Sequence, residues 1–418
     1  MVGAIPYRRY LLGVLLLILA LNTVDRLALG LLLQDVKIDL HATDTQLGLL
    51  SGIAFALFYS VMGVPIAQWA DRGNRIAVIA VTTVLWSVSL ALSAMAVTFM
   101  QLLLIRVGVA VGEAGCVPPA HSLIAHYFDR AERPRAVAIY MLGGTLGIVT
   151  GYFAAGWLSQ FYGWRMAFMV IGLPGLALAL LAWFTLEEPR RKAPVSAPPA
   201  DQATLRNTAA TLWANRTFRH LLFSFSLIAF FGNGVLQWQP AFFIRSYGLS
   251  TGELGTWLAV LYGLGGMVGV YIGGALASRL AAGNERLQLT TATYAYCAFA
   301  ILAASVYLVR SLHVTFVLTG LSQMGAAMIT APLFATIQTL VPERMRAISI
   351  AFLYLCANLV GMGLGPLAAG TLSDALRPLL GEESLRYALL ALCPGYLWAA
   401  WHLWCASRTV MEDLRGGH

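Results

Sequence analysis

Apolar stretches of about 17 to 25 residues, the length that crosses a bilayer as a helix, recur along the whole of this chain. Only 11% of its residues are charged, against about 25% in soluble domains. Barrel strands alternate polar and apolar residues, and these stretches do not. We therefore expect an all-α membrane protein with twelve transmembrane helices. The stretches lie at residues 9–33, 46–70, 76–98, 100–127, 135–160, 165–186, 218–243, 252–278, 288–309, 312–339, 346–372 and 385–408.

Basic residues are unevenly divided between the two sets of loops. With the N-terminus in the cytoplasm, nineteen lie on that side, six on the opposite side and two within spans, which accounts for all 27. Positive residues concentrate on the cytoplasmic side of membrane proteins. We expect a multi-pass protein of the inner (plasma) membrane with both termini cytoplasmic. The same bias explains the net charge of +8, so nucleic acid is not an expected partner.

The sequence gives no reason to expect a cofactor, a metal or an enzyme. Its five cysteines stand in apolar stretches without paired spacing, which fits neither a disulfide framework nor a metal site. His121 and His126 are five residues apart, a poor spacing for one metal on a helix. No Walker motif, nucleophile elbow or zinc-protease helix appears.

The two halves of the chain repeat one another. Asp71-Arg72 recurs 207 positions later as Ser278-Arg279. Parallel repeats of six helices are one architecture of secondary transporters, whose sites lie at the repeat interface near the midplane. We expect two pseudo-symmetric six-helix bundles, residues 1–189 and 217–418, joined by a proline-rich cytoplasmic connector at 190–216.

Four charged residues lie inside predicted spans, Asp25 and Arg26 in the first and Arg106 and Glu113 in the fourth. Each costs roughly 2.5 to 3.5 kcal/mol at the middle of a membrane helix, which points to function. Asn22, Asp25 and Arg26 stand at i, i+3 and i+4, and Arg106 and Glu113 are seven apart, so each set forms one stripe. We expect Arg26 to meet Glu113 in the bundle interior, with Asp25 or Arg106 completing the network.

These charges predict proton-coupled transport. Asp25 or Glu113 would gain and lose a proton as the cavity between the two bundles alternates between a hydrated and a closed state. Neutralisation would release Arg26 to bind an anionic headgroup, with Arg106 and Asn22 as further substrate contacts. The alternative is an ion network that only locks the helices, although apolar residues could build such a lock without an insertion cost.

In the predicted second bundle, charged residues stand only at the ends of the spans, and none lies well inside one. Its candidate substrate contacts are neutral: Gln237, Trp238 and Asn358. A cavity that is charged on one wall and amide-lined or aromatic on the other suits an amphiphile. The alternative for each residue is an interhelical hydrogen bond or an interface anchor.

Asp71, Arg72 and Arg75 follow the second span and are candidates for a gate. The Asp71 carboxylate would cap the positive N-terminus of a helix in the other bundle, such as the one that starts near Arg346, when the inner side is closed. Topogenic charge alone is the alternative for the two arginines. Ser278 at the repeat position of Asp71 makes any such latch asymmetric.

The segment Asp71-Arg-Gly-Asn-Arg75 resembles the loop signature of the major facilitator superfamily. Asn22-Thr-Val-Asp-Arg26 and the segment from Arg106 to Ala114 resemble the N-Y-x-D-R and R-x-x-x-G-x-G-E-A patterns of the spinster family, above all of its bacterial members. The resemblance implies translocation of lysophospholipids and sphingosine-phosphate-like amphiphiles. Thr23 replaces the usual aromatic residue and Ala110 a glycine, and organic-anion symporters carry similar segments.

The sequence thus predicts a secondary active transporter that works as a monomer by alternating access. Its partners would be an amphipathic, anionic lipid-like substrate, protons and membrane lipids. A proton-coupled symporter of small organic acid anions and a multidrug-type exporter are the alternatives. Symmetric rings of pore-lining residues would indicate an ion channel. A nucleophile or a set of metal ligands would indicate a membrane-embedded enzyme.

Overall fold

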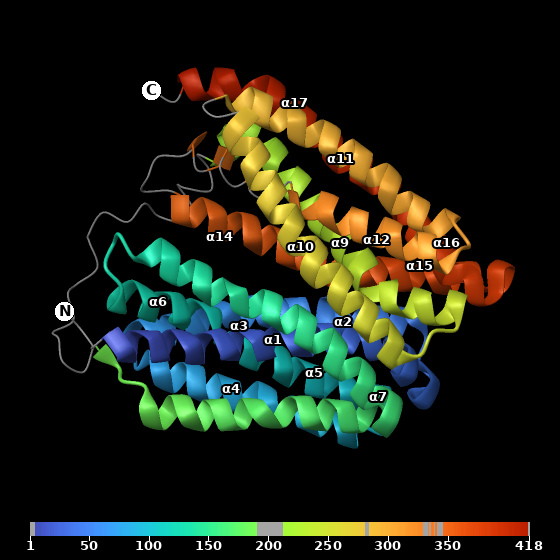
Figure 1. Cartoon of the computed structure of the whole chain (residues 1–418), viewed down its shortest axis with the longest axis horizontal. Helices are drawn as coiled ribbons and strands as arrows, with labels where there is room; N and C mark the ends of the chain where they lie inside the picture. Colours follow the sequence, from blue (N-terminus) through green and yellow to red (C-terminus); the bar gives the residue numbers. More distant parts are fainter. Residues whose placement is uncertain are drawn as a thin grey trace. The chain divides into compact units, whose positions relative to one another are not determined.

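The computed structural model describes residues 5–189, 212–280, 284–328 and 346–416 and part of 333–340. Within these ranges the chain is almost entirely helical and has no strand. Its helices fall into two compact units, drawn in Figure 1. Most of the predicted connector, 190–211, lies outside the described residues.

The first unit contains α1 to α7 together with the segment Gln239–Ala259. Its helices are α1 (Ile5–Leu40), α2 (Asp44–Ser51), α3 (Ile53–Arg72), α4 (Arg75–Leu92), α5 (Phe99–Glu113), α6 (Val117–Tyr127) and α7 (Arg133–Thr185). The remaining described helices form the second unit, apart from the ends of α9 and α10 that belong to that segment. They are α9 (Arg216–Tyr247), α10 (Thr251–Leu280), α11 (Glu285–Leu308), α12 (Leu312–Met328), α14 (Arg346–Cys356), α15 (Gly365–Leu380), α16 (Ser384–Leu392) and α17 (Pro394–Gly416).

The described helices confirm the expected all-α architecture with twelve spans. Among them, nine stretches are long and apolar enough to cross a membrane. Two of these, Arg133–Thr185 and Phe352–Leu414, are 53 and 63 residues long and each covers two predicted spans. The predicted span at 312–339 begins in α12 and continues beyond the described residues.

Local sequence signals set the helix boundaries. The side chains of Asn74 and Thr98 accept backbone N–H groups at the starts of α4 and α5, which satisfies donors that a helix start leaves open. Gly163 has φ +79° and ψ 162°, a conformation open essentially to glycine only, and it bends α7 between its two spans. Pro118 and Pro119 begin α6 after the chain leaves α5.

The helix α1 is longer than the predicted span at 9–33, because side-chain contacts hold its last turns. Asp35 accepts a hydrogen bond from Ser159 at 2.7 Å. Asp39 accepts one from the indole of Trp164 at 3.2 Å and pairs with Arg165. These partners all come from α7, which packs along α1.

A stripe of glycines on α7 allows α1 to approach closely. A methyl group added at Gly143 would lie 2.4 Å from the Leu16 carbonyl oxygen, and one added at Gly147 would lie 2.4 Å from the Ala20 carbonyl oxygen. One added at Gly151 would lie 3.0 Å from the Val24 Cα. This face of α1 therefore packs backbone to backbone on α7.

In the second unit, α11 packs along α17 and α12. Tyr396 of α17 contacts Tyr296 and Phe299 of α11, with ring centroids 5.9 and 4.9 Å away. The indole N–H of Trp238 donates to the Pro366 carbonyl oxygen at 2.8 Å and ties α9 to α15. A π-helical turn, Ala357–Leu364, joins α14 to α15.

We predict that Gly147→Ala lowers the thermal unfolding temperature in detergent. The new methyl group would collide with the Ala20 carbonyl, and overpacking of this kind costs about 1 to 3 kcal/mol. Gly144→Ala is the matched control, because nothing lies within 4 Å of a methyl group there. Equal unfolding temperatures for the two variants would contradict this account of the α1–α7 contact.

Candidate functional site

Four charged side chains from α1 and α5 form two buried ion pairs in the first unit. The Nε–H of Arg26 donates to Oε2 of Glu113 at 2.6 Å. Nη1 of Arg106 donates to the two carboxylate oxygens of Asp25 at 2.8 and 3.2 Å. The structure therefore brings the two predicted stripes together and assigns one arginine to each acid.

The members of this network differ in their access to open space. Asp25, Arg106 and Glu113 are buried, whereas the side chain of Arg26 is 31% exposed. Arg26 reaches Glu113 through its Nε–H, so this ion pair leaves the Nη–H donors of Arg26 for other acceptors. Arg26 is thus the member of the network that an outside anion can reach.

Three buried polar atoms around the network have no hydrogen-bond partner within the described part of the chain. They are Nδ2 of Asn22, Nε of Arg106 and Oε1 of Glu113. An unmet buried donor or acceptor costs about 1 to 3 kcal/mol. Asn22 stands one turn before Asp25 on α1. The network therefore has hydrogen-bonding capacity for water or for a ligand group.

Two aromatic residues of α3 complete the site, and the sequence analysis missed both. Phe55 and Tyr59 stack on one another, with ring centroids 5.7 Å apart and planes 19° apart. The Cζ of Arg26 lies 5.1 Å from the Phe55 centroid and 5.0 Å from that of Tyr59. The available signal was an i, i+4 aromatic pair, which an apolar span also uses for packing.

The candidate residues of the second half lie in the second unit. Trp238 is fully buried and holds α9 to α15. Gln237 is half-buried on α9. Asn358 is half-buried in the π-helical turn, a distortion that often occurs at functional sites.

Arg75, a predicted gating residue, is buried inside the first unit. Its backbone N–H and Nη2 donate to Glu188 at 2.6 and 2.5 Å, and its Nη1 donates to the Ser122 carbonyl and hydroxyl oxygens at 3.2 and 3.1 Å. It thus joins the start of α4 to α6 and to the segment after α7. Asp71 and Arg72 are exposed on the last turn of α3.

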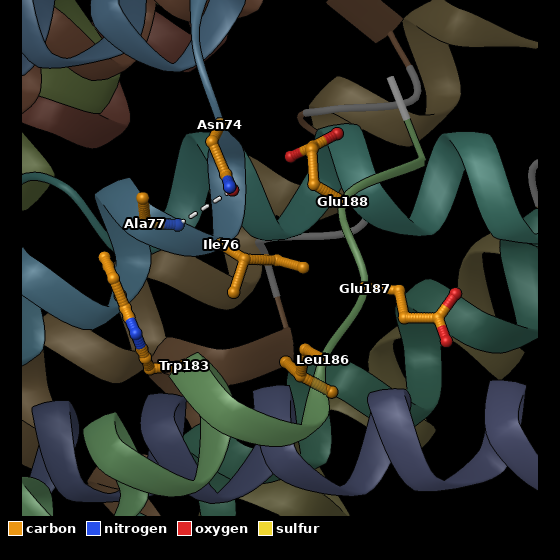
Figure 2. A pocket seen from close by; sticks show the side chains of 7 residues that line it. All are labelled: Asn74, Ile76, Ala77, Trp183, Leu186, Glu187 and Glu188. Carbon is orange, nitrogen blue, oxygen red and sulfur yellow. Dashed lines mark hydrogen bonds between the residues drawn. The ribbon is translucent and has the colours of Figure 1, made fainter. Parts of the chain in front are cut away.

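A pocket of about 340 Å³ lies beside this junction, between the start of α4 and the end of α7. Figure 2 shows Asn74 with its hydrogen bond to the Ala77 backbone, Glu188 near it and Trp183 on the opposite side. The Glu188 carboxylate in the pocket wall pairs with the Arg75 guanidinium and accepts the first backbone N–H of α4, so its negative charge is balanced.

A second buried charge cluster lies at the C-terminal end of α1, and the sequence analysis missed it as well. Asp44 is fully buried and accepts hydrogen bonds from Lys37 at 2.5 Å and from both Nη groups of Arg245 at 2.7 Å. The Nε–H of Arg245 donates to Gln34 at 2.7 Å. These contacts fix the end of α9 to α1 and α2.

No group of three or more His, Cys, Asp or Glu side chains in the described ranges is placed to hold a metal ion. The site described above is built for charge pairing, hydrogen bonding and cation–π contact. Those interactions suit reversible binding of an ionic group.

Comparison with known proteins covers nearly the whole chain. A family described as the Major Facilitator Superfamily matches residues 15–409. An "MFS-type efflux pump" of Mycolicibacterium smegmatis is 33% identical over 410 residues, which cover 96% of this chain and 93% of the pump. A "Hexuronate transporter" of Bacillus subtilis is 25% identical over 378 residues and 85% of each chain.

A solved structure has the same fold. It is a bacterial homologue of the human lysosomal transporter Spinster, in an inward-facing, occupied conformation. The TM-score is 0.85 and the sequence identity 29%, over 98% of this chain and 99% of that one.

We predict that Arg75→Ala strongly destabilises the protein, whereas Arg72→Ala does not. Removing Arg75 breaks its buried ion pair with Glu188, and breaking a buried pair in this way costs about 3 to 5 kcal/mol. Arg72 is exposed on the same loop and serves as the control. Thermal unfolding in detergent measures both, and similar unfolding temperatures would contradict a structural role for Arg75.

Proposed function

Because this chain belongs to the Major Facilitator Superfamily, we propose that it is a proton-coupled secondary transporter of an anionic, amphipathic, lipid-like substrate. Membership makes it a multi-pass membrane transporter of a small molecule. Lysophospholipids and sphingoid phosphates are the proposed substrate class. The proposal includes action as a monomer in the inner membrane, with both termini in the cytoplasm.

The partial exposure of Arg26 is the observation that carries the proposal. Its partner Glu113 is fully buried, while 31% of the Arg26 side chain is open. An anionic headgroup can therefore approach a guanidinium that is already held in place, and Arg–phosphate pairs are strong and directional. Arg106 is buried against Asp25, so its proposed contribution is to the positive field around the headgroup.

In the proposed coupling, the anionic headgroup of the substrate replaces the Glu113 carboxylate as the negative partner of Arg26. With Glu113 ionised, the four charges of the network balance and the substrate anion gains little. When Glu113 takes a proton, Arg26 becomes an uncompensated cation and binds the headgroup. Asp25 is the second candidate for the proton, because its carboxylate belongs to the same network. Proton and substrate therefore depend on one another through the same guanidinium.

The second unit offers neutral groups for the body of the substrate. We propose Gln237 and Asn358, both half-buried, as contacts to the glycerol or amide region. Trp238 is buried and hydrogen-bonded to Pro366. We therefore propose that it fixes α9 against α15 and so positions the neighbouring Gln237.

One alternative has support of its own. A relative of this chain is named a hexuronate transporter, and a hexuronate carboxylate could use the same guanidinium. This reading gives a proton-coupled symporter of small organic acids. A multidrug-type exporter is the other alternative, because another relative is named an efflux pump.

We predict that Glu113→Gln and Asp25→Asn each remove or flatten the pH dependence of transport. Uptake of radiolabelled lysophosphatidylglycerol into proteoliposomes, with and without a pH gradient, measures the effect. Neutral amides cannot exchange a proton, so uptake should no longer respond to the gradient. Asp35→Asn is the matched control, since Asp35 lies on the same helix but bonds Ser159 outside the network.

Wild-type gradient response in both variants would remove the coupling proposal. Competition in the same assay separates the substrate classes. Unlabelled lysophospholipids should inhibit uptake, whereas inhibition by glucuronate alone would favour the organic acid symporter.

We propose that Asp71, with Arg72 beside it, helps to close the cytoplasmic side by capping a helix N-terminus in the other bundle. Arg75 holds the start of α4 through its buried contacts to Glu188 and Ser122. Asp71→Asn should change the labelling rate of a cysteine introduced at Tyr354 on α14, the helix proposed to receive the latch. A membrane-impermeant thiol reagent added from the cytoplasmic side measures this rate. Asp129→Asn, in a different loop, is the control. Unchanged labelling in Asp71→Asn would contradict the latch.

A further inference from the structure

We propose that Phe55 and Tyr59 are positioning residues, a neutral aromatic platform that holds Arg26 in place for the substrate headgroup when Glu113 becomes protonated. The inference rests on the proposed function, because it explains how Arg26 keeps its position after losing its ionic partner.

The two rings present one continuous surface to the arginine. Phe55 and Tyr59 are one helical turn apart on α3, so both side chains project to the same side. The Cζ atom of Arg26 lies about equally far from the two ring centroids, at 5.1 and 5.0 Å. The guanidinium therefore spans the platform while its Nε–H reaches Glu113.

Phe55 also contacts the second arginine. The Cζ of Arg106 lies 5.8 Å from its centroid, and Phe55 itself is only 3% exposed. Cation–π attraction is strongest where water is excluded. Because one buried ring contacts both guanidiniums, it fixes the spacing between the Arg26–Glu113 pair and the Arg106–Asp25 pair.

An aromatic surface has the electrostatic property that this task requires. A second carboxylate could also hold Arg26, but it would compete with the substrate anion for the positive charge. A ring attracts a cation through its quadrupole and carries no net charge. The platform therefore restrains the guanidinium and leaves its charge available, which lowers the ordering cost of substrate binding.

The test measures KM and kcat for radiolabelled lysophosphatidylglycerol in proteoliposomes. Tyr59→Leu and Phe55→Leu should raise KM about tenfold, the size of one desolvated cation–π contact. Their kcat should stay within about twofold of wild type, because the lost contact acts on binding. Tyr59→Phe keeps the ring and loses only the hydroxyl that also bonds Arg26, so its KM should lie nearer to the wild-type value than that of Tyr59→Leu.

Two controls isolate the platform from general packing. Phe58→Leu removes an aromatic ring from the same helix, at a position that is 38% exposed, and should leave KM unchanged. Competition by a monoacylglycerol, which has no phosphate, should be equally strong in wild type and Tyr59→Leu, because the lost contact acts through the bound anion.

An unchanged KM in Tyr59→Leu and Phe55→Leu would overturn the platform. So would a fall in kcat with KM unchanged, or a KM for Tyr59→Phe as high as that for Tyr59→Leu. Failure of the proposed function has a different signature: Glu113→Gln and Asp25→Asn would then both keep the wild-type response to a pH gradient, whatever the aromatic variants do.

Discussion

The ion pair between Arg26 and Glu113, inside the membrane-spanning part of the first unit, is the interaction on which the rest of the site depends. Its two charges and those of Asp25 and Arg106 sum to zero, so the network can be buried as a whole. Each side chain has a partner only while α1 and α5 face one another. The pairing therefore fixes the rotation of both helices about their axes and decides which residues line the interior.

The packing of α1 follows from that requirement. Thr23 and Val24 lie against Gly147 and Gly151 of α7, while Asp25 and Arg26 bond to residues of α5. One helix thus carries two different faces within a single turn, one for backbone contact and one for charge. A larger side chain on α7 would displace the charged face together with the apolar one. The network and the glycine stripe are parts of the same arrangement.

Much of this arrangement could be predicted from the sequence. The lengths of the apolar stretches predicted the transmembrane helices. The helical spacing of Asn22, Asp25 and Arg26 predicted one polar stripe, which we expected to meet Glu113. What spacing could not supply was the identity of partners far apart in the chain. Arg75, a predicted gating residue, bonds to Glu188, 113 positions away, and is buried. Spacing likewise could not show that the Trp238 indole bonds to Pro366.

Some of the residues that sequence reasoning missed have a recognisable context. The sequence analysis assigns six basic residues to the side predicted to be non-cytoplasmic. Five of them pair with acids: Lys37, Arg165, Arg245, Arg377 and Arg386. A basic residue on that side therefore has a local reason to be there, which would have pointed to Asp44. Phe55 and Tyr59 offered no such signal, because a span of this kind is rich in aromatic residues and only the position of Arg26 distinguishes them.

The central claim is that the Glu113 carboxyl gains and loses a proton inside the protein. Infrared difference spectra of the purified transporter, recorded across a pH titration without substrate, test it directly through the carbonyl band of a protonated carboxylic acid. The account predicts a band that appears on acidification in wild type and is missing in Glu113→Gln. A spectrum in which Glu113→Gln retains the full wild-type band would contradict it.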